Sequence, residues 1–169
     1  SKDEVLEEVE RRIRTAERDL ERMVRRNEEL IRDAKREHER SNRENERLVT
    51  EAKREIDIEE VKRELDEVLK KSKRVNDKAK EELDRVLEKS KRVADEIRRL
   101  LREVLDKVRK LGNDKDVLDE LRDIIRRLRE ELKKSSDDLE RIIRRSVKES
   151  RDSSEELRKI IEDLKREAT

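Results

Sequence analysis

The sequence predicts an all-α protein, an antiparallel up-down-up bundle of three long and nearly straight helices. Leu, Ile and Val recur at helical spacing along most of the chain, a pattern typical of amphipathic helices. Proline, which would end or kink a helix, does not occur in the 169 residues. Short loops between the helices make neighbours antiparallel.

Cap and turn signals divide the chain into three helical segments. The single glycine, Gly112, follows a basic turn and precedes Asn113 and Asp114. This order is typical of a helix C-cap, a short loop and a new N-cap. The predicted helices cover about 2–54, 58–111 and 115–167, with loops near 55–57 and 112–114.

The second boundary carries a weaker signal than the glycine. Asp57 and Glu60 have the spacing of a capping box, and Ile56 can pack against Val61 in the first turn. Ser1 provides a similar N-cap for the first helix. We therefore expect each helix to begin at a capped residue.

A repeat of 18 residues supports the helical prediction. Leu121, Leu139 and Leu157 are 18 residues apart, and ELDEVLKKSKRV at 64–75 returns as ELDRVLEKSKRV at 82–93. Eighteen residues make five turns, so the apolar stripe does not drift around the helix. The helices should be nearly straight, and each roughly 80 Å long.

Composition favours one ordered domain, residues 1–169. Charged residues make up 59%, but 50 basic residues balance 49 acidic ones, whereas disordered chains usually carry a large net charge. Each apolar stripe spans roughly 120°, which suits a helix that touches two neighbours. A four-helix assembly would need a similar arc, so the stripe leaves the number of helices in the assembly open.

The stretch AKREHERSNRENER, residues 34–47, interrupts the apolar pattern without leaving the helix. No apolar residue occurs between Ala34 and Leu48, yet several polar residues take the phase of the apolar stripe. These residues are His38, Ser41, Asn42 and Asn45.

Polar residues on the other two helices are predicted to lie at the same level. Folding the chain at its turns predicts which residues of neighbouring helices lie opposite each other. The numbers of two opposite residues add up to roughly 111 for the first and second helices, and to roughly 226 for the second and third helices. The predicted layer contains His38, Ser41, Asn42, Asn45, Ser72, Asn76, Ser146, Ser150 and Ser153, with Ser154 at its edge. A smaller second layer combines Ser90 with Ser135 and Ser136, with Asn27 some way off.

Such layers usually fix register and partner identity, because an unpaired buried polar group costs about 1–3 kcal/mol. The alternative is a loosely packed and partly hydrated end of the bundle. A deliberate layer predicts that replacing Asn42, Ser72 and Ser150 together by aliphatic residues preserves or raises stability while loosening specificity.

The 18-residue repeat, the cap signals, the polar layers and the absence of Phe, Trp, Tyr, Pro, Cys and Gln resemble de novo designed helical bundles with buried hydrogen-bond networks. The resemblance covers the whole chain and rests on these general sequence features, not on a specific motif. It implies a designed scaffold without natural biochemical activity, expressed as a soluble recombinant cytoplasmic protein. The class also contains hetero- and homo-oligomers, so the alternative is one component that binds a partner helix or hairpin.

Other functions find little support in the sequence. His38 is the only histidine; it could act as a pH switch, but membership of the hydrogen-bonded layer is the preferred interpretation. No catalytic Ser/His/Asp constellation is expected, since His38 is the only histidine that could act as the base for any of the serines. We expect no catalytic, cofactor-binding or metal-binding residues, and no nucleic acid, membrane or small-molecule partner. A partner, if one exists, would be another designed helical chain or a second copy.

Overall fold

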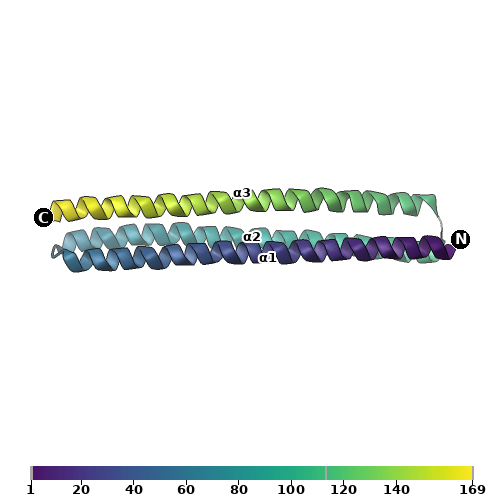
Figure 1. Ribbon diagram of the computed structural model, residues 1–169, viewed down its shortest axis with the longest axis horizontal. Helices are drawn as coiled ribbons and strands as arrows, with labels where there is room; N and C mark the ends of the chain where they lie inside the picture. Colours follow the sequence, from purple (N-terminus) through teal and green to yellow (C-terminus); the bar gives the residue numbers. More distant parts are fainter. Residues whose placement is uncertain (1, 113, 169) are drawn as a thin grey trace. The chain divides into compact units, whose positions relative to one another are not determined.

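The computed structural model describes residues 2–112 and 114–168, and confirms an all-α three-helix bundle. Figure 1 shows the helices in chain order: α1 (Lys2–Glu55), α2 (Glu59–Leu111) and α3 (Lys115–Ala168). Their bounds lie within one residue of the predicted ones. No described helix has the length and apolar character needed to cross a membrane.

The chain forms two compact units, each built from segments of all three helices. Unit 1 combines the chain up to Glu29 with Val86–Leu139, and unit 2 combines Leu30–Arg85 with the chain from Glu140 onward. Ion pairs show the antiparallel course of α1 and α2 inside each unit. Arg109 pairs with Glu10 at 3.5 Å in unit 1, and Lys53 pairs with Asp66 at 3.0 Å in unit 2.

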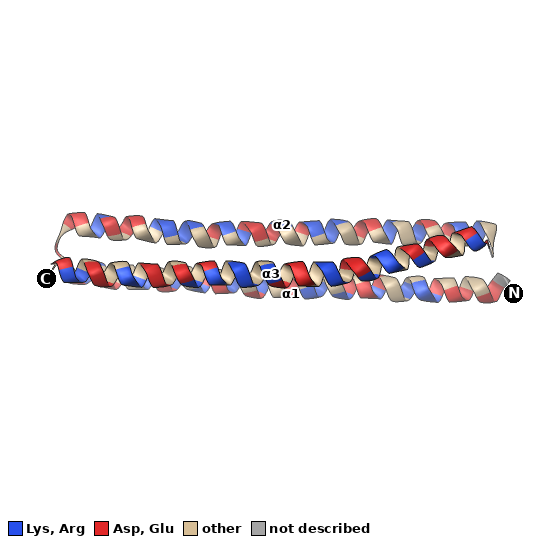
Figure 2. Ribbon diagram, turned by 90° about the horizontal axis from the view of Figure 1, so that it is seen from above, with Lys and Arg blue, Asp and Glu red and all other residues tan. Residues whose placement is uncertain are grey.

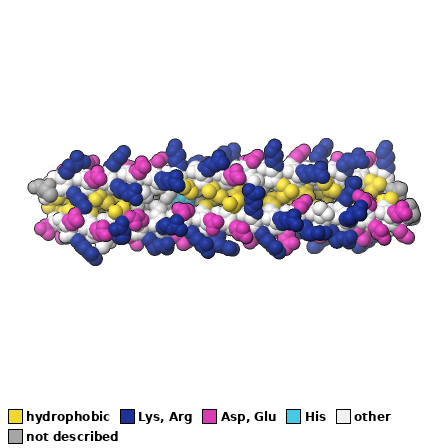
Figure 3. Space-filling view, viewed as in Figure 1, with side chains coloured by type: hydrophobic (Ala, Val, Ile, Leu, Met, Phe, Trp, Pro, Cys, Tyr) yellow, Lys and Arg dark blue, Asp and Glu magenta, His cyan; other side chains and the backbone are white. Residues whose placement is uncertain are grey.

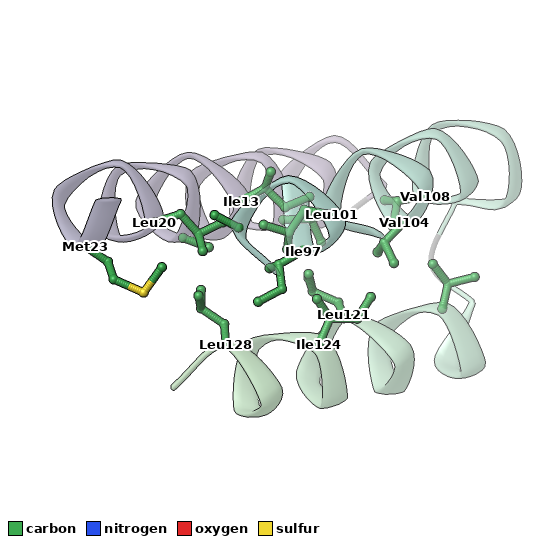
Figure 4. Packing of buried hydrophobic residues seen from close by; sticks show 14 residues of the cluster. Ile13, Leu20, Met23, Ile97, Leu101, Val104, Val108, Leu121, Ile124 and Leu128 are labelled. Carbon is green, nitrogen blue, oxygen red and sulfur yellow. The ribbon is translucent and has the colours of Figure 1, made fainter. Parts of the chain in front are cut away.

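Unit 1 has an apolar core to which every helix contributes. Leu20 of α1 and Leu101 of α2 are fully buried, and Leu121 of α3 is 2% exposed (Figure 4). Burying one such side chain contributes about 1.5–3 kcal/mol. These contacts explain why segments distant in the sequence pack together in this unit.

Unit 2 has a smaller continuous apolar cluster and more buried polar residues. Leu65 of α2 and Leu157 of α3 are fully buried in that cluster, next to Ala52 of α1. Six buried polar residues also lie in this unit: His38, Asn45, Ser72, Asn76, Ser146 and Ser150. Hydrogen bonding therefore takes a larger share of the interior here than in unit 1.

The turn between α2 and α3 has the predicted geometry. Gly112 has φ of 70°, and its N–H donates to the Val108 carbonyl at 2.9 Å, as in an αL C-cap. Asp114 caps α3, because its Oδ1 accepts the Asp116 N–H at 2.8 Å. Asn113, the alternative cap, and Ser1, the predicted cap of α1, lie outside the described residues.

Gly112→Ala is expected to lower the free energy of unfolding by about 1 kcal/mol, because a Cβ is disfavoured at positive φ. Urea denaturation followed by circular dichroism measures the loss. Gly112→Asn is the matched control and should lose less, since asparagine tolerates this conformation. Equal stability of the alanine variant and the parent would contradict the assignment.

The turn between α1 and α2 differs from the prediction by one residue. The first helical bond here runs from the Lys62 N–H to the Ile58 carbonyl at 3.1 Å. Ile58, and not Asp57, therefore precedes the helix, so the predicted capping box is displaced. The apolar part of the prediction agrees with the structure: Ile56 is 3% exposed, and Val61 packs against the same cluster.

The register of α1 against α2 was predicted wrongly, whereas that of α2 against α3 agrees. Asp84, expected opposite Asn27, instead pairs with Lys35 at 3.0 Å. The shift is about two helical turns. Lys107 pairs with Glu120 at 3.1 Å, within one position of the predicted register.

Charges cover the outer faces of all three helices. Figure 2 shows basic and acidic residues interleaved along each helix, without a long block of one sign. Many form pairs three or four residues apart, such as Arg40 with Glu37 at 2.6 Å. Exposed pairs of this kind add only about 0.3–0.5 kcal/mol each. They support helix formation more than they decide how the helices pack.

Candidate functional site

The polar stretch 34–47 is helical throughout and places its stripe residues inside unit 2. Glu, Arg, Lys and Ala between them favour helix formation on their own. His38 is fully buried and Asn45 is 1% exposed, while Ser41 and Asn42 are half-buried. The residues that lack apolar character thus still occupy the core face of α1.

Asn76 of α2 is the centre of the hydrogen-bond network. Its Nδ2 donates to Asn42 Oδ1 at 2.7 Å and to Ser41 Oγ at 3.3 Å. Its Oδ1 accepts from His38 Nδ1 at 2.9 Å and from Ser150 Oγ at 2.8 Å. An amide offers two donors and two acceptor positions, so Asn76 is fully satisfied although it is completely buried.

The network also assigns the protons of His38. Because Asn76 Oδ1 can only accept, the proton lies on Nδ1, and Nε2 faces Ser146 Oγ at 3.1 Å. With the proton on Nδ1, Nε2 is an acceptor for a hydrogen bond from the Ser146 hydroxyl. The same hydroxyl lies 3.1 Å from the Ile143 carbonyl, a second acceptor one turn earlier on α3.

Three serine hydroxyls continue the network between α1 and α3. Ser41 Oγ lies 3.1 Å from Ser150 Oγ and 3.2 Å from Ser154 Oγ. A hydroxyl has one proton and accepts two bonds, so Ser41 reaches its capacity with these serines and Asn76. Asn76 and Ser41 together link all three helices through side chains alone.

Asn45, Ser72 and Ser153 form a separate group in the same unit. Asn45 Nδ2 donates to Ser72 Oγ at 2.6 Å, and Ser153 Oγ lies 3.2 Å from Ser72 Oγ. Asn45 Oδ1 is buried and has no hydrogen-bond partner among the described residues. One unsatisfied buried acceptor costs about 1–3 kcal/mol. This group is therefore less favourable than the one centred on Asn76.

The second predicted layer lies in unit 1. Asn27 Nδ2 donates to Ser90 Oγ at 2.8 Å and to Ser135 Oγ at 3.1 Å. Asn27 was expected some way from the two serines, and the shifted register of α1 corrects that. Ser136 is half-buried and makes no hydrogen bond to the other described residues.

A cavity of about 510 Å³ opens between α1 and α3 beside the network. Its wall combines buried network members with charged side chains at the rim. The lining residues are Glu37, His38, Arg40, Ser41, Glu44, Val147, Ser150, Arg151, Ser154, Glu155 and Arg158. Three arginines balance three glutamates, so the cavity has no strong charge preference.

Glu44 at the rim forms an ion pair with Arg47 of the same helix. Arg47 donates to both carboxylate oxygens of Glu44, at 2.5 and 3.1 Å. This hydrogen bonding lowers the pKa of Glu44 and raises the pKa of Arg47. Both groups are exposed to solvent, so the pair keeps Glu44 ionised and contributes little to folding.

Ser146, His38 and Asn76 have the order of a nucleophile, a base and an orienting amide. The sequence placed all three side chains in one predicted layer, but the hydrogen bonds that order them come from the structure. The three side chains are at most 2% exposed, and Ser146 lies inside a helix whose amides bond to one another. Among the described residues, no cluster of three or more His, Cys, Asp or Glu could hold a metal ion.

Comparisons with protein-family models, curated proteins and solved structures found no match to this chain.

Proposed function

We propose that the protein is a designed structural scaffold, without natural biochemical activity, whose buried polar layer specifies the register of its helices. The observation that carries the proposal is Asn76, which satisfies all four of its hydrogen-bonding positions with residues of α1 and α3. The designed origin rests on the resemblance in repeat, composition and caps described above.

Polar contacts can specify register because a hydrogen bond is lost when a shift of the helix puts a different residue in place of the donor or acceptor. A slip of α2 by seven residues that brings Leu69 to the place of Asn76 would keep a helical apolar surface. It would remove the acceptor of His38 and the donor to Asn42. Apolar contacts lose less in such a slip, since one aliphatic side chain can replace another.

Cross-linking at two alternative registers tests the proposal. An apolar-layer variant removes the Asn76 network by replacing its members with residues of similar size. It carries His38→Leu, Ser41→Ala, Asn42→Leu, Asn76→Leu, Ser146→Ala, Ser150→Ala and Ser154→Ala. In the parent and in this variant, Lys35→Cys is combined with either Asp84→Cys or Asp77→Cys and treated with a short bifunctional maleimide.

The parent should cross-link through position 84, which pairs with Lys35, and much less through position 77, about two turns away. The apolar-layer variant should cross-link through both positions, because its register is no longer specified. The same strong preference for position 84 in both proteins would show that the layer does not set the register.

A further inference from the structure

Unit 1 has a second cavity between α1 and α3, with a different character from the one beside the polar network. Its volume is about 400 Å³. Ala16 and Leu128 are buried in its floor, and Ile125 and Leu132 are half-buried. The complete lining is Arg11, Arg12, Thr15, Ala16, Asp19, Ile125, Leu128, Arg129 and Leu132.

The small side chain of Ala16 explains the hollow. It occupies a stripe position of α1 where larger aliphatic residues stand elsewhere, such as Ile13 and Leu20. Larger side chains of α3 therefore meet a gap at this level. Figure 3 shows hydrophobic side chains between rows of charged ones on one face of the chain.

The rim of this groove is basic. Arg11 and Arg12 share a single carboxylate, that of Glu8, with Arg12 Nε 3.1 Å from Glu8 Oε1. Arg129 has no ion pair among the described residues. Asp19 is the one acidic side chain in the lining. An apolar floor with an excess of guanidinium groups favours a partner that is apolar on one face and acidic at its edges.

We propose that this groove docks an acidic amphipathic helix of another protein. A groove between two helices accepts a third helix through aliphatic side chains spaced three and four residues apart. Acidic residues beside those anchors would pair with Arg11, Arg12 and Arg129. The proposal concerns unit 1 and does not depend on the polar layer of unit 2.

A fluorescent helical peptide of about five turns, with leucines at i and i+4 and glutamates beside them, is the probe. Its charge-reversed form, with lysine in place of each glutamate, is the matched control. We expect saturable anisotropy with the acidic peptide, weakened at high salt, and at least tenfold weaker binding of the basic one. Equal binding of both peptides, or no binding of the acidic one, would overturn the proposal.

Two variants locate the binding. Arg12→Glu combined with Arg129→Glu changes exposed side chains, so folding should persist while affinity falls at least tenfold. Arg126→Glu, on α3 but outside the groove, should bind like the parent. Ala16→Leu should also weaken binding by filling the groove, provided that circular dichroism shows a folded protein. Unchanged affinity in the double arginine variant would refute this site.

Two further measurements separate the remaining outcomes. Light scattering of the chain alone tests for a second copy in the groove. A dimer that the acidic peptide does not dissociate would overturn the choice of occupant. The double arginine variant leaves the polar layer intact and should keep the parent's cross-linking preference for position 84, so a failure of the register proposal and a failure of this one are distinguishable.

Discussion

Replacing Asn76 with leucine is expected to lower the free energy of unfolding by about 3–5 kcal/mol. Leucine has a similar size, so packing changes little. The loss comes from the partners of Asn76: His38 Nδ1 loses its acceptor and Asn42 Oδ1 loses its donor, both in or beside a buried layer. Urea denaturation followed by circular dichroism gives the difference from the parent.

Ser136→Ala serves as the control for this experiment. Ser136 is half-buried but makes no hydrogen bond to other described residues, so its variant should stay within about 0.5 kcal/mol of the parent. A loss below about 1 kcal/mol for Asn76→Leu would mean that water replaces the lost bonds, and that the network does not hold unit 2 together.

The apolar-layer variant is expected to be at least as stable as the parent, although it contains the same Asn76→Leu change. Removing every member of a buried polar network leaves no unsatisfied partner, and aliphatic packing then adds stability. The variant should therefore exceed Asn76→Leu by about 3 kcal/mol or more in free energy of unfolding. The same urea titration measures both proteins.

The structure changes the expected result for the smaller set of replacements that the sequence suggested. Replacing only Asn42, Ser72 and Ser150 would remove two partners of Asn76 and the acceptor of Asn45 Nδ2. We now expect that triple variant to lose stability. If the apolar-layer variant proves no more stable than Asn76→Leu, specific packing around the layer matters more than hydrogen bonding.

The fold was predictable because helical phase is a local property. The apolar period and the turn at Gly112 located all three helices within one residue of their observed bounds. Phase also predicted that His38 and Asn45 point into the interior, although their neighbours in the sequence are charged. Both side chains are at most 1% exposed.

The pairing of those residues was less predictable because it depends on the register between helices. Sequence reasoning placed Asn27 away from Ser90, whereas the two are hydrogen-bonded at 2.8 Å. The helix bounds do not fix this register: they were predicted within one residue, yet Asp84 pairs with Lys35 and does not lie level with Asn27.

For this chain, the sequence alone determined the helices, their buried faces and which polar residues lie on those faces, since a period of 3.6 residues relates every side chain to its own helix axis. Only the tertiary structure decided that Asn76 is the centre of the network, that Ser146 meets His38 and that Asn45 Oδ1 has no described partner. The bonds that join different helices, and the missing bond of Asn45, depend on distances of about 3 Å, much shorter than one helical turn.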